Sequence, residues 1–283
     1  MNMHTFCFGT VGSPNFTPKK PGGSVGAILC IREIGLRALE LGWVRAVRIS
    51  EKSCQEIQIT SQAQEILISV HAPYFINMNA DDEEWPKSRR RLMDAAHYGN
   101  LAGATDIIFH PGSYFGQPPD SVLPKVILRL SACVDELRAA GSPVILRPEI
   151  MGKSAMLGSL EDTLRMAQEV PGVEPCLDFA HLHARAGDGS MNTHQEWCQV
   201  LTAYGNTLGQ EALLRLHIHL SGIEYGPKGE RKHLPLAEAD LDLHGLFHAL
   251  HEFGCSGRIL CESPEMEDDA LKMQALWAEI AGK

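Results

Sequence analysis

Residues 66–72 read ILISVHA, a short apolar run that ends beside a histidine. Runs of this kind alternate along the chain with longer amphipathic segments, which is typical of βα units around a parallel sheet. Eight such runs occur, at residues 4–10, 44–50, 66–72, 106–111, 144–149, 174–179, 214–220 and 258–263. Eight strands close a TIM barrel, so we predict an α/β fold, a (β/α)8 barrel forming a single domain over residues 1–283. A doubly wound open sheet is the alternative, and the absence of a G-x-G-x-x-G turn after the first run disfavours it.

The composition is that of an ordinary globular protein. With 44% hydrophobic residues, a chain of 283 residues can bury a large core. The first ten residues have no leader pattern, and no stretch approaches the ~18 consecutive apolar residues of a membrane span. We therefore expect a cytoplasmic protein with no membrane partner. Eight scattered cysteines without CxxC pairs indicate reduced thiols rather than a disulfide framework.

The formal net charge of −10 argues against indiscriminate binding to nucleic acid, because a polyanion gains affinity from Lys and Arg. A local basic cleft is still compatible with that charge. Its candidates are Lys19 with Lys20, the basic run at 87–91, and Lys228 with Arg231 and Lys232. Each of these clusters, taken singly, is more typical of a solvated face.

Strand after strand ends in a side chain that can bind a metal ion or move a proton. The six residues are His71, His110, Glu149, Asp178, His219 and Glu262. In a TIM barrel the C-terminal ends of the strands meet at one mouth, where active sites are built, so we expect these side chains to converge. Imidazole and carboxylate together suit zinc, manganese or iron, and the number of carboxylates indicates a bridged centre. One strand-end His or Glu is usually structural, but six favour a metal site.

Two segments add candidates. DFAHLHARAG (178–187) places His181 and His183 in a predicted loop over the mouth, with His181 the better ligand candidate. SGIEYGPKGERKHLPL (221–236) is predicted to be a long polar loop, and a loop of that size is usually functional. In LRLHIHL (214–220), His217 faces the same side as His219 but lies deeper, so we interpret it as a buried core histidine. The histidines of predicted helices belong to the outer ring.

Six features occur in order through nearly the whole chain. They are HAPYFIN (71–77), FHPGS (109–113), Glu149 at a strand end, DFAH (178–181), HLSG (219–222) with a following His, and CESP (261–264). Together they resemble the endonuclease IV family, the second family of apurinic/apyrimidinic endonucleases, within the wider group of xylose-isomerase-like barrels. HAPY-x-x-N with HPG is fairly specific, whereas D-x-x-H alone is not.

The resemblance implies a cluster of two or three zinc ions, with manganese as an alternative. It implies that His71 and His110 hold one ion and that Glu149 bridges it to a second. Asp178, His219 and Glu262 complete the second ion's ligands, while His181 and His233 belong to a third.

The resemblance also implies an activity. A metal-bound hydroxide would attack the phosphodiester 5′ to an abasic site in DNA, with Glu149 as the catalytic residue. Tyr74 and Phe75 match positions that the family inserts into DNA, and Arg231 and Lys232 add positive charge to this expected substrate-binding set. A monomer is expected, as is usual in the family.

Three departures indicate a divergent branch. The family has Asp-x-His before its last histidine ligand, whereas the aligned triplet here is Arg231, Lys232 and His233. Glu230 could replace the missing carboxylate only if the loop is shaped differently. Ser221 and Gly222 stand where the family has an Asn-Asp pair, and ISEKSCQEI (49–57) replaces an early DNA-binding loop. The two-metal core is intact, so the departures concern the third ion and DNA recognition.

Two other functions remain open. A sugar isomerase or epimerase would use one divalent metal to polarise a carbonyl, with Glu149 and Glu262 as acid and base. The charge and the replaced DNA loop favour it, and the histidine-rich ligand set does not. A barrel that binds without catalysis is disfavoured because all six strand-end ligands are present.

Overall fold

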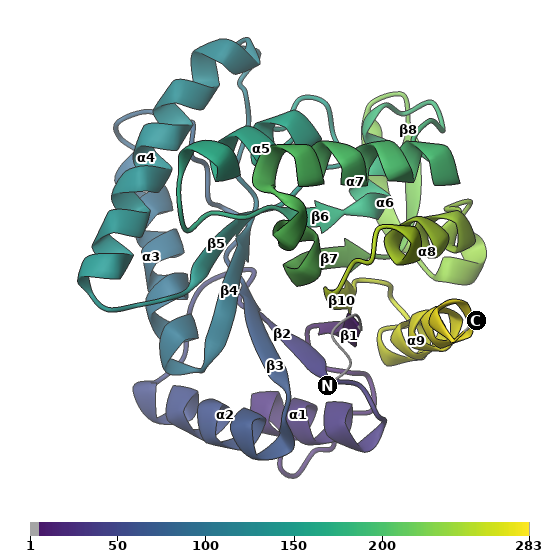
Figure 1. The fold of residues 1–283 in the computed structure, drawn as a ribbon. Coiled ribbons are helices and arrows are strands. Elements are labelled where there is room, and N and C mark those ends of the chain that lie inside the picture. The colour runs from purple at the N-terminus through teal and green to yellow at the C-terminus, as the bar shows by residue number, and fades with distance from the viewer. Residues whose placement is uncertain (1–5, 283) are drawn as a thin grey trace.

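Eight parallel strands form the centre of the computed structural model, which describes residues 6–282. They are β1 (Phe6–Val11), β2 (Ala38–Gly42), β3 (Leu67–His71), β4 (Ala104–Phe109), β5 (Ile145–Pro148), β6 (Cys176–Asp178), β7 (Leu216–Leu220) and β10 (Gly257–Cys261). They pair in the order β5-β4-β3-β2-β1-β10-β7-β6, and parallel bridges from Leu146 to Val173 and from Glu149 to Cys176 join the two ends. The sheet thus closes almost completely, and the predicted TIM barrel is confirmed (Figure 1).

Helices surround the strands, as Figure 1 shows. They are α1 (Gly23–Glu33), α2 (Glu51–Gln64), α3 (Trp85–Leu101), α4 (Pro119–Ala139), α5 (Leu160–Glu169), α6 (Phe179–Arg185), α7 (His194–Leu208), α8 (Leu243–Glu252) and α9 (Glu267–Ala281), with short 3-10 helices η1 (Gln210–Arg215) and η2 (Leu236–Glu238). Large apolar side chains such as Phe8, Trp197 and Phe247 are buried in the core. Hydrophobic burial of this layer holds the barrel and its helices together.

The second predicted strand was wrong. Residues 44–50 form the connection to α2, and β2 lies earlier, at Ala38–Gly42. Alternating Val and Arg in 44–50 resembles a half-exposed strand, but a parallel strand covered on both faces is usually almost continuously apolar, and ALELG is apolar apart from Glu40. Gly35, at φ 88°, ends α1 just before it. Residues 4 and 5 of the first predicted strand lie outside the described residues.

Two predicted loops are regular structure instead. Residues 221–236 contain an antiparallel hairpin of β8 (Gly222–Gly226) and β9 (Gly229–Leu234). After β6 the chain turns at once into α6, because the Asp178 carboxylate caps that helix by accepting from the backbone N–H of His181 at 2.7 Å. His181 and His183 therefore lie on a short buried helix and not on a loop.

A charged cluster is buried inside the barrel, on residues near the starts of β4 and β10. The Asp106 carboxylate pairs with the guanidinium of Arg147 and lies 3.0 Å from that of Arg258. Burial alone would raise the pKa of Asp106, but the charges of Arg147 and Arg258 outweigh it and lower that pKa well below its ordinary value. The cluster links three strands by paired charges.

Two further expectations concern the chain as a whole. All eight cysteines lie among the described residues and are free thiols, most of them buried. Across residues 6–282, no helix has the length and apolar character needed to cross a membrane.

Candidate metal centre

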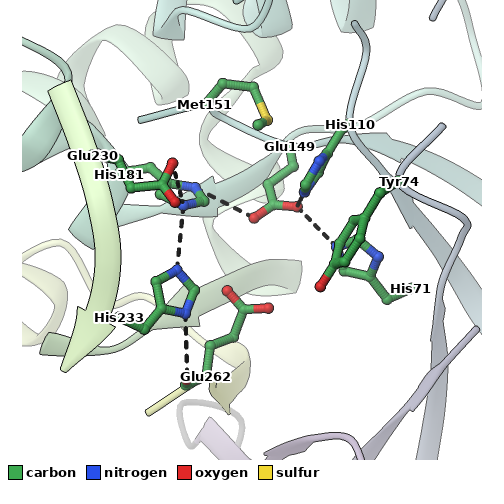
Figure 2. A pocket seen from close by; sticks show the side chains of 9 residues that line it. All are labelled: His71, Tyr74, His110, Glu149, Met151, His181, Glu230, His233 and Glu262. Atoms are coloured by element: carbon green, nitrogen blue, oxygen red, sulfur yellow. Dashed lines mark hydrogen bonds and ion pairs between the residues drawn. The ribbon is translucent and has the colours of Figure 1, made fainter. Parts of the chain in front are cut away.

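The six strand-end residues converge at the mouth of the barrel, where four of them line one cavity, while Asp178 and His219 are fully buried and do not line it. His71 and Asp178 end β3 and β6, and His110, Glu149 and Glu262 directly follow β4, β5 and β10. The cavity has a volume of about 240 Å³ and is lined by His71, Tyr74, His110, Glu149, Met151, His181, Glu230, His233 and Glu262. Figure 2 shows Glu149 between His71 and His110 on one side and His181 on the other.

The first group of donors is His71, His110 and Glu149, whose ligand atoms all lie within 4.8 Å of one another. Nδ1 of His71 is 2.9 Å from the carbonyl oxygen of Ala72, and a carbonyl can only accept, so this nitrogen carries the proton. The other ring nitrogen, Nε2, faces Glu149 Oε2 at 3.2 Å, and Nε2 of His110 lies 3.2 Å from the same oxygen. Backbone contacts of this kind fix the tautomer of metal-binding histidines.

The second group is Glu149, Asp178, His219 and Glu262. Nδ1 of His219 lies 3.4 Å from Glu149 and 3.6 Å from Glu262. While Oδ1 of Asp178 caps α6, its Oδ2 is buried with no hydrogen-bond partner among the described residues, although His181 Nδ1 lies 3.1 Å away. A buried carboxylate oxygen without a hydrogen bond is costly unless a cation compensates it.

The third group, His181, Glu230 and His233, joins α6 to the hairpin. His181 and His233 donate from Nδ1 to the backbone carbonyls of Ile150 and Glu262, at 2.9 and 3.2 Å. Their Nε2 atoms face one another at 3.4 Å, and Glu230 Oε2 lies 3.5 Å from that of His181. Two lone pairs at this distance repel unless a cation or a proton lies between them.

Glu230 was not among the predicted ligands, and the hairpin brings it into the third group. Its backbone N–H donates to the carbonyl of Gly152 at 2.8 Å. The hairpin and the loop after β5 come very close to one another here. A Cβ on Gly229 would lie 2.2 Å from the Gly152 oxygen, and a Cβ on Gly152 would lie 2.7 Å from the Glu230 Cβ. Glycine at both positions lets the hairpin lie against the loop after β5. The carboxylate of Glu230 thereby joins the third group, to which the aligned Arg231 cannot contribute a carboxylate.

The protonation behaviour of this cavity indicates a shortage of positive charge. Burial, with repulsion from Glu262 and Glu149, raises the pKa of Asp178 to about 7. Burial lowers the pKa of His181, but Asp178 and Glu149 outweigh it and raise that pKa to about 10. Groups that retain protons in this way are typical of buried clusters of carboxylates. The cluster is therefore suited to bind cations.

The donor spacing agrees with zinc coordination. Donors about 2.1 Å from a tetrahedral zinc ion lie about 3.4 Å apart. The separation of the His181 and His233 Nε2 atoms is 3.4 Å, and Glu149 Oε2 lies 3.2 Å from both His71 and His110. Nitrogen and carboxylate donors also suit manganese and iron, so the geometry fits a divalent transition metal without selecting one.

The four residues predicted to bind substrate lie in different surroundings. Tyr74 lines the cavity and stacks on His110, with ring centroids 5.0 Å apart. Phe75 does not line the cavity, and 63% of its surface is exposed. Arg231 and Lys232 lie on β9 outside the cavity, where both pair with Glu224 at 3.3 Å.

Other candidates occupy structural positions. His183 lies between the carbonyl of Ser190 and the carboxylate of Asp240, at 2.9 and 3.0 Å.

His217 is buried as predicted, and its partner is Glu40, a residue that the sequence interpretation missed. Burial, only partly offset by Glu40, lowers the pKa of His217 to about 4, so this ring is neutral. Burial would raise the pKa of Glu40, but His219 and His217 outweigh it, and the carboxylate stays ionised.

Comparison with known proteins identifies relatives over nearly the whole chain. The xylose isomerase-like TIM barrel family matches residues 30–280. An uncharacterized protein from Methanocaldococcus jannaschii is 35% identical over 274 residues, which cover 96% of this chain and 97% of that protein. A probable endonuclease 4 from Oceanobacillus iheyensis is 28% identical over 173 residues, which cover 58% of this chain and 55% of that protein.

Solved structures share the fold. Endonuclease IV from Thermus thermophilus superposes with a TM-score of 0.73 and 24% identity, covering 96% of this chain and 99% of that one. A D-psicose 3-epimerase superposes with a TM-score of 0.66 and 12% identity, covering 93% and 95%. The same barrel is thus present in a nuclease and in a sugar epimerase.

Proposed function

The chain belongs to the xylose isomerase-like TIM barrel family, and from this membership and the geometry of the mouth we propose that it is a metal-dependent phosphodiesterase acting on DNA with abasic sites. Sequence similarity to a probable endonuclease 4 supports the proposal. So does the HAPY-x-x-N motif at residues 71–77.

One observation carries the proposal: three groups of donors adjoin at the mouth of the barrel, each contributes residues to a single cavity, and two of them share Glu149. His71, His110 and Glu149 would hold one ion, and Glu149, Asp178, His219 and Glu262 a second. His181, Glu230 and His233 would hold a third. Divalent ions bound there would supply Lewis-acid chemistry, activating water and stabilising negative charge on a phosphate. Clusters of ions suit in-line displacement at phosphorus, whereas the alternative function as an isomerase or epimerase would use a single ion.

The protein's own groups have distinct tasks in this proposal. Glu149 is buried and ionised, because the charges of His110 and His219 outweigh burial and lower its pKa, so it would serve as a negatively charged ligand in both adjoining groups. Burial and the charges of Glu262 and Glu149 raise the pKa of Tyr74 to about 12. The phenol therefore keeps its proton at neutral pH and can donate a hydrogen bond to a phosphate oxygen.

A second candidate is a sugar isomerase or epimerase that uses one divalent ion. The group of Glu149, Asp178, His219 and Glu262 favours it, because these four donors could hold a single ion without the others. Its two flanking carboxylates, Glu149 and Glu262, could then exchange protons with a sugar.

The proposal is tested by elemental analysis of the purified protein together with incision of a duplex that carries one synthetic abasic site. We expect two or three zinc or manganese ions per chain and cleavage 5′ to the lesion. Glu149→Gln keeps the size of the side chain and removes its charge, so we expect it to lose incision by at least about 100-fold and to lose bound metal, since removing one ligand weakens a whole bridged centre.

The matched control is Glu169→Gln, which removes an exposed carboxylate of α5 that pairs with Arg165. It should keep wild-type metal content and incision. One bound ion, no incision and turnover of a ketose would favour the isomerase, and normal incision by Glu149→Gln would contradict the assigned role.

A further inference from the structure

A buried carboxylate contacts His219 from inside the barrel. Glu40 lies on β2, is completely buried, and places Oε1 3.0 Å from Nε2 of His219. The opposite ring nitrogen of His219, Nδ1, faces Glu149 and Glu262. β2 and β7 are separated by two strands in the barrel, so this contact is made across the barrel interior.

The orientation of Glu40 is fixed by its other oxygen. Oε2 accepts from the hydroxyl of Ser69 at 2.7 Å and lies 3.0 Å from Nε2 of His217. Ser69 is the cross-strand neighbour of Glu40 on β3, and His217 precedes His219 by two residues on β7. With Oε2 occupied, Oε1 has no other hydrogen-bond partner among residues 6–282, and neither has the His219 Nε2. Oε1 of Glu40 is thus the carboxylate oxygen that faces this nitrogen, with the Cys176 thiol as another group beside the ring, although the ring N–H does not point straight at the oxygen.

We propose that Glu40 is a positioning residue that holds the proton of His219 on Nε2 and so presents the unprotonated Nδ1 to the cation held by Glu149, Asp178 and Glu262. The inference rests on the proposed function, since it presupposes that cation. A carboxylate behind a metal-binding imidazole fixes the ring and makes it a better ligand. Glu40 supplies this contact from β2, a strand to which no predicted ligand was assigned.

The energetics argue against a purely structural role. A buried ion pair contributes little more to stability than apolar side chains of similar volume, because both charged groups lose their hydration. Glu40 is the one ionisable residue of β2, and its neighbours Leu39 and Leu41 are buried on the opposite face of the strand, toward the helices. A carboxylate at this position is therefore better explained by what it does to His219 than by stability alone.

The test is zinc binding, measured by competition with a chromophoric chelator, together with the absorption spectrum of the cobalt-substituted protein. We expect Glu40→Gln to weaken one ion per chain about 10- to 100-fold and to alter the cobalt spectrum, since loss of such a partner has this effect. Ser69→Ala removes only one donor to Glu40, so it should fold normally and weaken the same ion by a smaller factor.

The matched control is Asp106→Asn, which neutralises another carboxylate buried inside the barrel but touches no candidate ligand. Its zinc affinities and cobalt spectrum should equal those of the wild type at a temperature where it is folded. If the wild type binds no ion, both the proposed function and this inference are contradicted. If the wild type binds zinc and both Glu40→Gln and Ser69→Ala bind it equally well, only the positioning role is overturned.

Discussion

Tyr74 and Phe75 are adjacent in the chain, yet they suit different tasks at the mouth. Tyr74 is half-exposed and stacks on His110, so it can act on a group inside the cavity. Phe75 is 63% exposed and lies outside the residues that line the cavity. An exposed aromatic ring beside a nuclease site can stack on a base next to the lesion.

We therefore predict that Phe75→Ala weakens binding of an abasic duplex by about 1–3 kcal/mol, roughly 5- to 150-fold, and leaves metal content unchanged. Binding is measured by fluorescence anisotropy with the metal-loaded protein. Ile59→Ala serves as the control, because Ile59 is equally exposed at 66% but lies on α2. Equal affinity of Phe75→Ala and wild type would remove Phe75 from the substrate-binding set.

Single residues could be predicted from the sequence where their position in the chain determines their place in the fold. The six strand-end candidates could be placed together because each follows or ends an apolar run, and strand ends meet at the mouth. Glu40 could not, because the second strand was predicted at residues 44–50 and ALELG, which follows α1, was assigned to no strand. The available signal was Gly35, which ends that helix and leaves room for a strand.

At the scale of elements, the hairpin of β8 and β9 completes the third group of donors. Its register places His233 opposite Ile223 and Lys232 opposite Glu224. Glu230 turns toward His181, whereas Glu224 pairs with Arg231 and Lys232 at the surface. The hairpin thus carries two glutamates in contrasting positions.

This contrast gives a matched pair of variants. Glu230→Gln should weaken the ion held with His181 and His233 about 10- to 100-fold, because a charged ligand is lost. Glu224→Gln removes only exposed ion pairs, which contribute little, so its metal affinities should be those of the wild type. Zinc titration of both variants is the measurement. Equal affinities in the two would mean that Glu230 is not a ligand.

The hairpin and α6 were not predicted from the sequence, and the reason is physical. Pro, Gly and charged residues in 221–236 suit a loop, and only pairing between Gly222–Gly226 and Gly229–Leu234 makes them strands. Likewise the seven residues of α6 are too few for a helix to be stable by propensity, so its Asp178 cap and burial decide its structure. Tertiary contacts of this kind are not visible in local patterns.

For the whole molecule, the charged cluster inside the barrel has a predictable effect on stability. Asp106 pairs with Arg147 and Arg258 and is 4% exposed, so its pKa is lowered below its ordinary value of 3.8. A carboxyl whose pKa is lower in the folded than in the unfolded protein stabilises the fold above pH about 4. That contribution is lost as the pH falls toward the folded-state pKa.

Asp106→Asn should accordingly lower the free energy of unfolding by about 3–5 kcal/mol at pH 7, because it removes the carboxylate that pairs with both Arg147 and Arg258 and leaves Glu174 as the remaining carboxylate partner of Arg147. The difference in the free energy of unfolding between the variant and the wild type should decrease below pH about 4, because the contribution of the Asp106 carboxylate to wild-type stability decreases there. Urea unfolding at pH 7, 4 and 3 measures both effects. A difference that stays constant with pH would show that the charge of Asp106 is not responsible.

The barrel as a whole could be predicted although one strand was misplaced. Moving the second strand from 44–50 to Ala38–Gly42 changes neither the number of strands nor their order, so the mouth stays where the other strand ends put it. Closure between β5 and β6, by contrast, depends on bridges such as Glu149 to Cys176, which only the assembled barrel provides. The alternation of short apolar runs and helices thus predicts the architecture but not its details.

The central claim is that one cavity holds several adjoining cations around Glu149. Crystallographic anomalous scattering at the zinc absorption edge, with crystals of the zinc-loaded protein, tests it most directly. We predict separate peaks between His71 and His110, beside Asp178 and His219, and between His181 and His233. A single peak within the group of Glu149, Asp178, His219 and Glu262 would contradict the account and favour a sugar isomerase or epimerase.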